Sequence, residues 1–349
     1  MTTSWYQQPK TDDGPILSSR VRLARNVRKY PFQQKITPQA ATRMVRDAQV
    51  AISLAPRGLF HQMDMQALGA TEQQVFLEKH IISPEFLQGN LPRGLLISDD
   101  QNLSVMLNEE DHVRIQSVQA GDDLTSALSM ANQIDDLIEE RVEYAFHPDY
   151  GYLTACPTNI GTGLRASYMI HLPCLERLDK TKSLLPVISK FGITLRGIYG
   201  EGTESMGGIY QISNQTTLGK SEADIIQCLQ NVTKKVLDHE SLAREHLLNA
   251  HYQDVEDQVH RAYGLLTYSR KMSGKEAMSL LSDVRLGYLT GLLTMPRPPK
   301  RIYQIMMEIQ PGHLQRVAGT EMNDSERDAA RATYLRRIWG CAPSNLQEE

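Results

Sequence analysis

Apolar and polar positions near the N-terminus alternate with the period of a β-strand. In residues 16–25, Ile16, Val21 and Leu23 can face a core while Arg20 and Arg22 point the other way. Considered alone, this segment is most simply interpreted as a solvated edge strand. The apolar runs 94–98 and 103–107 are separated by a DDQN turn and predict a hairpin.

Helical periodicity marks several other segments. Pro38 in the first turn, with Thr37 or its neighbour near the cap, predicts where one helix begins, and Ser221 predicts the start of another. The predicted helices cover residues 38–53, 71–80, 122–145, 175–189 and 221–248. Further strands are predicted over a segment that ends at Cys156, within 165–178 and over 191–199 and 207–215.

These strands come in hairpin pairs rather than in strict alternation with helices. This arrangement predicts an α+β fold, with an antiparallel-leaning sheet and helices on one side, up to about residue 247. The remainder reads as helices separated by Gly, Ser and an MPRPP stretch. We therefore predict two domains, over residues 1–247 and 248–349, of which the second is all-α.

Composition and charge narrow the class of protein. Of the 349 residues, 41% are hydrophobic and 22% charged, as in soluble globular proteins, and the net charge of −4 argues against nucleic acid or an acidic membrane as a partner. The four cysteines are scattered, which supports neither a zinc site nor a disulfide framework. The N-terminus lacks the apolar core of a signal peptide, so a cytoplasmic location is expected.

Two polar positions have more than one interpretation. If residues 106–117 are extended, Glu110, His112 and Arg114 share one face, where they form either a simple ion pair or a base beside a phosphate clamp. Periodicity does not decide between these. His80 ends the helix predicted over 71–80, where a histidine most often serves as a C-terminal cap and less often as a ligand.

Two glycine-rich turns each lie beside an arginine, Arg165 or Arg196, and no GK[ST] follows them as in a Walker loop. Glycine lets backbone N–H groups approach an anion, and arginine offers a planar fork of donors to phosphate. A guanidino acceptor becomes nucleophilic only when a carboxylate orients it and takes a proton. Five arginines, two carboxylates and one cysteine therefore fit phosphoryl transfer from ATP to a guanidino nitrogen.

Four segments in order resemble motifs of the ATP:guanido phosphotransferases, the family of creatine and arginine kinases. They are SSRVRLAR (18–25), NEEDHVR (108–114), CPTNIGTGLRAS (156–167) and RGIYGEGTES (196–205). The resemblance implies an antiparallel, glutamine-synthetase-like sheet flanked by helices. It also implies that ATP lies across the sheet with Mg²⁺, which the nucleotide carries without ligands from protein side chains.

The resemblance also implies roles for single residues. Glu110 is the expected base, Glu201 the second substrate carboxylate and Cys156 the reactive cysteine, while Arg20, Arg22, Arg114, Arg165 and Arg196 are the phosphate-binding arginines. The implied nucleotide-binding set is Ser18, Ser19, Arg20, Val21, Arg22, His80, Arg114, Arg165, Ala166, Ser167, Tyr168, Met169, Arg196, Gly197, Ile198, Tyr199 and Gly200.

Two departures point to a subgroup. Only 17 residues precede Ser18, so the helical domain that encloses small guanidino substrates is expected to be absent. The added C-terminal helices contain RDAARA, with Arg327, Asp328, Arg331 and Ala332. Both features resemble the bacterial protein arginine kinases, and the resemblance implies a regulatory phosphoarginine site there. Arg327 and Arg331 are four residues apart and can share a helix face; the competing interpretation is an exposed charged helix.

The leading hypothesis is therefore a kinase that phosphorylates arginine side chains in proteins. A kinase of free arginine or another small guanidino compound is the alternative within enzymes, and a nucleotide-binding adaptor is the alternative outside them. The resemblance implies roles in stress response and in marking proteins for a Clp-type unfoldase and protease, with an activator protein and a repressor as partners. A two-fold homodimer is the commonest oligomer by default.

Overall fold

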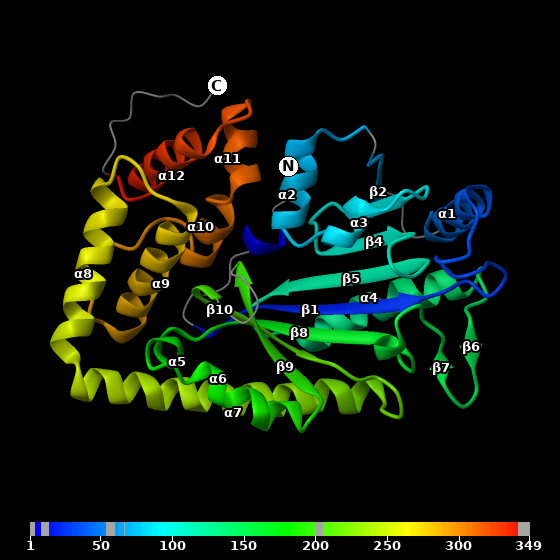
Figure 1. Cartoon of the computed structure of the whole chain (residues 1–349), viewed down its shortest axis with the longest axis horizontal. Coiled ribbons are helices and arrows are strands. Elements are labelled where there is room, and N and C mark those ends of the chain that lie inside the picture. The colour runs from blue at the N-terminus through cyan, green and yellow to red at the C-terminus, as the bar shows by residue number, and fades with distance from the viewer. Residues whose placement is uncertain (1–3, 8–13, 54–59, 66, 200–204, 341–349) are drawn as a thin grey trace.

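The computed structural model describes residues 4–7, 14–53, 60–65, 67–199 and 205–340. Its centre is an eight-stranded sheet in the order β2-β3-β4-β5-β1-β8-β10-β9, with antiparallel pairing throughout (Figure 1). The strands are β1 (Ile16–Arg25), β2 (Phe60–Met63), β3 (Gly94–Ser98), β4 (Leu103–Leu107), β5 (Val113–Ala120), β8 (Leu164–His171), β9 (Ile193–Tyr199) and β10 (Ser205–Asn214). The expected antiparallel α+β fold is confirmed.

Strand β1 lies at the middle of this sheet, between β5 and β8, so the interpretation as a solvated edge strand was wrong. Its alternation was predicted correctly, since Val21 and Leu23 are fully buried in the core. Arg20 and Arg22 lie on the other face of the strand, where their side chains are half-buried rather than fully solvated.

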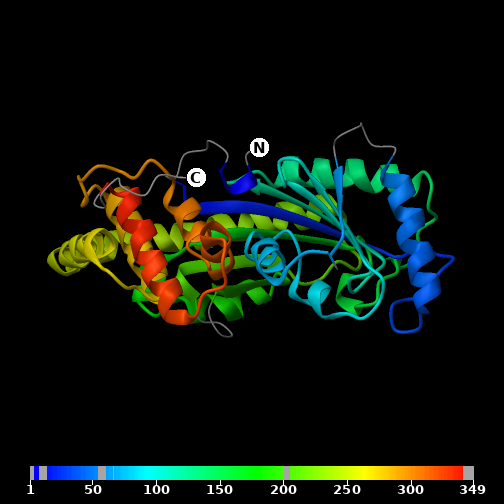
Figure 2. The same cartoon turned by 90° about the horizontal axis from the view of Figure 1, so that it is seen from above.

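Helices cover the core face of the sheet. Helix α4 (Leu124–Glu139) packs on β1 and β5, and α7 (Glu222–Ala250) packs on β8 and β10 (Figure 2). Local signals set several helix ends as predicted: Thr37 caps α1 (Pro38–Ile52), and Ser221 forms a capping box with Asp224. The shorter helices are η1 (Trp5–Gln7), α2 (Ala70–Glu78), α3 (Pro84–Gln88), η2 (Pro157–Asn159), α5 (Pro173–Arg177) and α6 (Thr181–Ser189).

The structure differs locally from the sequence analysis in three places. The strand expected to end at Cys156 is instead a hairpin of two short strands, β6 (Phe146–His147) and β7 (Gly151–Tyr152), because Gly151 has a φ of +74° and turns the chain. The helix expected over 175–189 is split into α5 and α6, and Asp179 between them has a φ of +51°. Residues 108–112 form a turn rather than extended chain, and Asn108 has a φ of +61°.

The C-terminal part is helical, as predicted. It consists of α8 (Tyr252–Tyr268), α9 (Gly274–Thr290), α10 (Ile302–Glu308), α11 (Pro311–Ala318) and α12 (Asp324–Ile338). Helix α9 packs closely on β10, where a Cβ on Gly207 would lie 2.5 Å from the carbonyl oxygen of Met278. Helix α7 runs through residue 247, where the domain boundary was predicted. None of the helices in the described ranges is long and apolar enough to span a membrane.

Candidate active site

The register of five neighbouring strands places the predicted arginines on one face of the sheet. Arg22 on β1 lies opposite Arg165 on β8 and opposite Gln116 on β5, and directly paired residues share a face. Arg114 on β5 lies opposite Ala24, two residues along from Arg22. At the far edge, Arg196 on β9 lies opposite Gln211 on β10. This face is the one turned away from α4 and α7.

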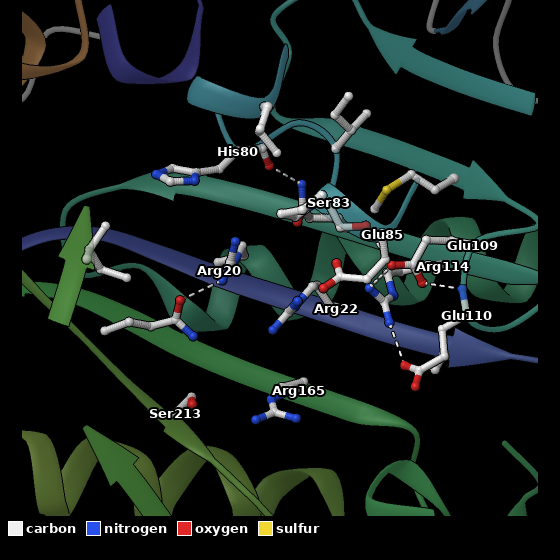
Figure 3. Close-up of a pocket in the computed structure, with 18 of the residues that line it drawn as sticks. Arg20, Arg22, His80, Ser83, Glu85, Glu109, Glu110, Arg114, Arg165 and Ser213 are labelled. Atoms are coloured by element: carbon white, nitrogen blue, oxygen red, sulfur yellow. Dashed lines mark hydrogen bonds and ion pairs between the residues drawn. The ribbon is translucent and has the colours of Figure 1, made fainter. Parts of the chain in front are cut away.

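A cleft of about 1080 Å³ lies over this face, which is large enough for a nucleotide and a second group (Figure 3). Ten of the predicted site residues line it: Arg20, Arg22, His80, Glu110, Arg114, Cys156, Arg165, Arg196, Gly197 and Ile198. Residues from six separate regions of the sequence thus meet at one place.

The remaining predicted nucleotide-binding residues lie elsewhere. Strand alternation turns the side chains of Ser19, Val21, Ala166 and Tyr168 to the opposite face, where Tyr168 donates a hydrogen bond to Asp122. Three others are buried in the sheet and do not border the cleft: Ser18, Ser167 and Met169. Tyr199 ends β9, and the predicted Gly200 and Glu201 lie outside the described residues.

The guanidinium groups in the cleft are not all neutralised by carboxylates. Within the described residues, Arg22 and Arg165 form no ion pair, and the buried Nε of each lacks a hydrogen-bond partner. Burial, reinforced by three neighbouring arginines, lowers the pKa of Arg22 well below its usual range. Burial also lowers the pKa of Arg165, with Arg196 the next cause. Such an array of cations attracts a multiply charged anion.

The NEEDH turn carries two adjacent glutamates with different environments. The Glu109 side chain is 0% exposed, and its Oε1 accepts hydrogen bonds from Arg114 at 2.5 Å and from Ser83 at 2.6 Å. The Glu110 side chain is 41% exposed, and its Oε2 lies 3.1 Å from Nη2 of Arg114. Glu109 therefore orients Arg114, while Glu110 presents a carboxylate to the open cleft. The shared face of Glu110, His112 and Arg114 would require an extended chain, and that condition is not met because the chain turns here.

Asp111 in this turn ties it to the cysteine loop. Asp111 is fully buried and accepts hydrogen bonds from the backbone N–H of Ala155 and from Asn26, both at 2.6 Å. Burial raises its pKa. Cys156 follows Ala155 directly, borders the cleft and lies 3.1 Å from Oγ1 of Thr158. The turn thus holds Glu110 and Cys156 in a fixed relation.

His80 is not the helix cap that we considered most common. Its backbone has a φ of +57°, its carbonyl accepts a hydrogen bond from Gln116, and its ring borders the cleft near Arg20 (Figure 3). Burial, helped by Arg20 and Arg22, lowers the pKa of His80 to about 3. The imidazole is therefore neutral at physiological pH, which suits a hydrogen bond better than a charge contact.

The two arginines of the C-terminal RDAARA motif lie in different environments. Arg331 is 4% exposed on its side chain and donates to the carbonyls of Ile309 at 3.1 Å and Met272 at 2.9 Å and to Asp328 at 2.7 Å. Ala332 beside it is buried. Arg327 is more exposed and bonds Asp324 and the carbonyl of Met322. Although the two arginines are four residues apart, only Arg327 is directed to the surface.

Several cleft residues were not predicted from the sequence. The α2 and α3 region supplies some, β10 supplies others, and two come from the start of α11 in the C-terminal part. They include Gln74, Leu77, Glu78, Ser83, Glu85, Glu109, Gln116, Gln211, Ser213, Gln310 and Pro311. Arg20 donates to Gln211 at 2.8 Å. The NEEDH motif itself signalled Glu109, but no motif signalled that the start of α11 borders the cleft. Across the described parts of the chain, no three His, Cys, Asp or Glu side chains gather to hold a metal.

Comparison with known proteins identifies relatives over nearly the whole chain. Residues 44–243 match the model of the ATP:guanido phosphotransferase, C-terminal catalytic domain, and residues 252–349 match that of the Protein-arginine kinase McsB C-terminal domain. A protein-arginine kinase of Caldanaerobacter subterraneus is 44% identical over 93% of this chain and 96% of its own. One of Bacillus velezensis is 42% identical over 99% and 96%.

Solved structures of guanidino kinases share the fold. A lombricine kinase matches with a TM-score of 0.59 and 24% identity over 68% of this chain and 69% of its own. The duplicated taurocyamine kinase from Schistosoma mansoni matches with a TM-score of 0.61 and 24% identity over 73% and 40%. With its family-model matches and its close relatives taken together, the chain belongs to the ATP:guanido phosphotransferases and, within them, to the protein-arginine kinases.

Proposed function

We propose that the cleft is where this protein-arginine kinase transfers the γ-phosphoryl group of ATP to an arginine side chain of a protein. Arg20, Arg22, Arg114, Arg165 and Arg196 hold the phosphates, and ATP arrives as its Mg²⁺ complex. The acceptor arginine enters beside Glu110, Cys156 and Glu201. We assign catalysis to residues 1–247 and regulation to residues 248–349.

The observation that carries this proposal is the surplus of positive charge on one face of the sheet. Arg22 and Arg165 lie opposite each other on neighbouring strands, partly buried, with no ion-pairing carboxylate in the described chain. Folding two guanidinium groups together in this way costs free energy unless an anion binds between them. A triphosphate supplies several negative charges and acceptor oxygens in a compact group.

The carboxylate of Glu110 is the base that takes a proton from the acceptor arginine. One of its oxygens is held by Arg114, and the side chain is open to the cleft. A guanidinium nitrogen loses a proton to this carboxylate as its lone pair attacks the γ-phosphorus. The bond from phosphorus to the β,γ-bridging oxygen breaks, so the products are ADP, a phosphorylated arginine and one proton. Cys156 and Glu201 orient the guanidinium.

The test is incubation of the full chain with ATP and an unfolded basic protein, followed by mapping of phosphopeptides under neutral conditions. We expect acid-labile phosphate on arginine. The same reaction with free arginine distinguishes a kinase of small guanidino compounds, which would phosphorylate the amino acid more efficiently than the protein. The absence of any ATP turnover would favour the nucleotide-binding adaptor.

We also propose that the RDAARA motif binds phosphoarginine as a regulatory site. Arg327, which is directed to the surface, contacts the phosphate, and Asp328 contacts the guanidino group, while Arg331 fixes Asp328 from the buried side. Arg327→Ala should abolish any effect of added phosphoarginine on the rate while leaving the basal rate in place. An unchanged response would remove this assignment.

The cellular role follows from the class of enzyme by analogy. We propose that the protein acts in the cytoplasm during stress, that the phosphoarginine it makes marks proteins for a Clp-type unfoldase and protease, and that its partners include a repressor and an activator protein. Recovery of phosphoarginine-bearing proteins with a catalytically inactive Clp-type protease, dependent on this gene, is the measurement that tests the role.

A further inference from the structure

The cleft is bordered at one end by the C-terminal helical part. Gln310 and Pro311, the cap and first residue of α11, line the same cleft as the arginines. They approach it beside α2, against which α11 packs (Figures 1 and 2). His80 follows α2 and lies on the opposite side of the cleft from Glu110 (Figure 3). The end of the cleft bounded by α2 and α11 is therefore remote from the acceptor carboxylate.

One buried carboxylate joins these two helices. Glu78, the last residue of α2, is 8% exposed and accepts hydrogen bonds from the backbone N–H of Gly312 at 2.7 Å and of His313 at 3.1 Å. These N–H groups belong to the first turn of α11 and therefore have no acceptor within the helix. The helix dipole also favours a negative charge at this end. Gln74 donates a further hydrogen bond to Glu78 at 3.0 Å.

The two helices approach too closely for a side chain between them. A Cβ on Gly312 would lie 2.8 Å from Cγ of Gln74 and 3.0 Å from the backbone nitrogen of Val75. Glycine at this position therefore lets α11 contact α2 directly. The backbone of α2 is not free to retreat, because Val75 is buried in the core.

The position of α11 is also fixed from its other side. Nε of Arg331 donates to the carbonyl of Ile309, the residue just before Gln310. Residues 309–312 are thus held between Glu78 on α2 and Arg331 on α12. Since Glu78 is two residues from His80, a shift of this turn moves both walls of the same end of the cleft.

We propose that residues 309–312 form a wall of the nucleotide site and that Glu78 is the positioning residue that holds this wall in place. This inference rests on the proposed nucleotide cleft. It adds a contribution from the C-terminal part to ATP binding itself, in a region that no sequence motif marks. The wall acts on the affinity for ATP rather than on the transfer step, because it lies away from Glu110.

The test uses the full chain with two independent variants. Glu78→Gln removes the charge and weakens the hydrogen bonds to α11, and Gly312→Ala pushes α11 from α2. Each should raise the KM for ATP and the Kd for ATP about tenfold, the size expected when one charge-assisted contact is lost. The kcat at saturating ATP and the KM for the protein substrate should stay within about twofold.

Each variant has a matched control, which makes the same substitution at another glutamate or glycine of a helix. Glu72→Gln changes a carboxylate in the first turn of α2, and Gly264→Ala adds a methyl group in α8, where no atom outside the helix's own neighbouring backbone lies within 4 Å of the new Cβ. Both should keep the KM for ATP of the parent chain. Thermal unfolding of all four variants separates loss of fold from loss of affinity.

An unchanged KM and Kd for ATP in folded Gly312→Ala would overturn the inference, as would a fall in kcat with the KM unaltered. If Glu78→Gln does not fold, Gly312→Ala decides alone. The outcome is distinct from failure of the proposed function. If the proposed function is wrong, the parent chain itself transfers no phosphate to arginine. The comparison of ATP affinities between the parent chain and the variants then still tests whether residues 309–312 form a wall of the nucleotide site.

Discussion

Adjacent residues in the NEEDH turn have opposite environments, and this difference separates positioning from chemistry. Glu109 is buried and bonded to Arg114 and Ser83, so its carboxylate is fully engaged. Glu110 is open to the cleft. A carboxylate that must accept a proton from a substrate needs access to it, and only the second glutamate has this access. The resemblance to the family implied Glu110 as the base, and the exposure of its carboxylate to the cleft is the physical reason why it, rather than Glu109, can act as one.

Replacing Glu110 by glutamine should nearly abolish phosphoryl transfer. The amide is similar in size but cannot accept the proton, and loss of a general base costs about 10²- to 10⁴-fold in rate. The Kd for ATP should change little. Steady-state rates and ATP titration check both expectations. Glu143→Gln, in an exposed ion pair with Arg28, is the control that should leave the rate unchanged. A fully active Glu110→Gln would refute the assignment.

The imidazole of His80 should stay neutral over the whole range in which the protein is folded. Burial and the nearby Arg20 and Arg22 lower its pKa to about 3, whereas the unfolded chain has the ordinary value near 6.5. Below about pH 6.5 the unfolded state therefore binds the extra proton, so this residue makes the fold less stable as the pH falls toward 3. NMR of ring-labelled histidines without nucleotide tests this; titration of His80 near pH 6.5 would contradict it.

At the scale of elements, the turn between β4 and β5 organises the acceptor side of the cleft. Its Asp111 bonds the backbone of Ala155 and so fixes the segment that carries Cys156, while the preceding residue presents its carboxylate. The distance between base and cysteine is thus set by one buried side chain. That side chain does not itself border the cleft.

Asp111→Ala should therefore reduce kcat more than it affects ATP binding. Loss of the buried acceptor leaves the backbone N–H of Ala155 and one N–H of the Asn26 amide without this partner, which costs about 1–3 kcal/mol in the free energy of unfolding. Denaturant unfolding, kcat and the Kd for ATP give the three readouts. Asp149→Ala, at an exposed carboxylate, serves as the control. If kcat is unaffected, the turn does not position the cysteine loop.

Elements whose signals are local were predicted from the sequence. The hairpin over 94–107 and the cap at Thr37 depend on neighbours a few residues away, and both lie where expected. The place of β1 in the sheet was not predictable, because its partners lie far away in the sequence, about 90 to 100 positions for β5 and about 140 to 150 for β8. The left-handed Asn108 likewise gave no signal in the sequence that the chain turns after residue 107.

At the scale of the whole molecule, the cleft draws on both the catalytic sheet and the C-terminal helices. Motif resemblance found the arginines, since each lies in a recognisable segment. It could not find Gln310, which lacks a motif and reaches the cleft only through the packing of α11 on α2. The buried Arg331 connects that helix to the RDAARA motif. The proposed regulatory and nucleotide sites thus share one stretch of backbone.

Arg331→Lys should therefore weaken ATP binding although Arg331 does not line the cleft. A lysine ammonium cannot reproduce the planar fork that bonds two carbonyls and Asp328, so about 1–3 kcal/mol of stability should be lost and residues 309–312 should shift. We expect the KM for ATP to rise several-fold. Arg327→Lys, on the same helix and directed outward, should keep the parent KM when phosphoarginine is absent.

The double variant Arg331→Lys with Glu78→Gln should have a KM for ATP little higher than that of either single variant, because both residues act on the same turn. Full additivity of the two in KM would mean that they act through separate routes.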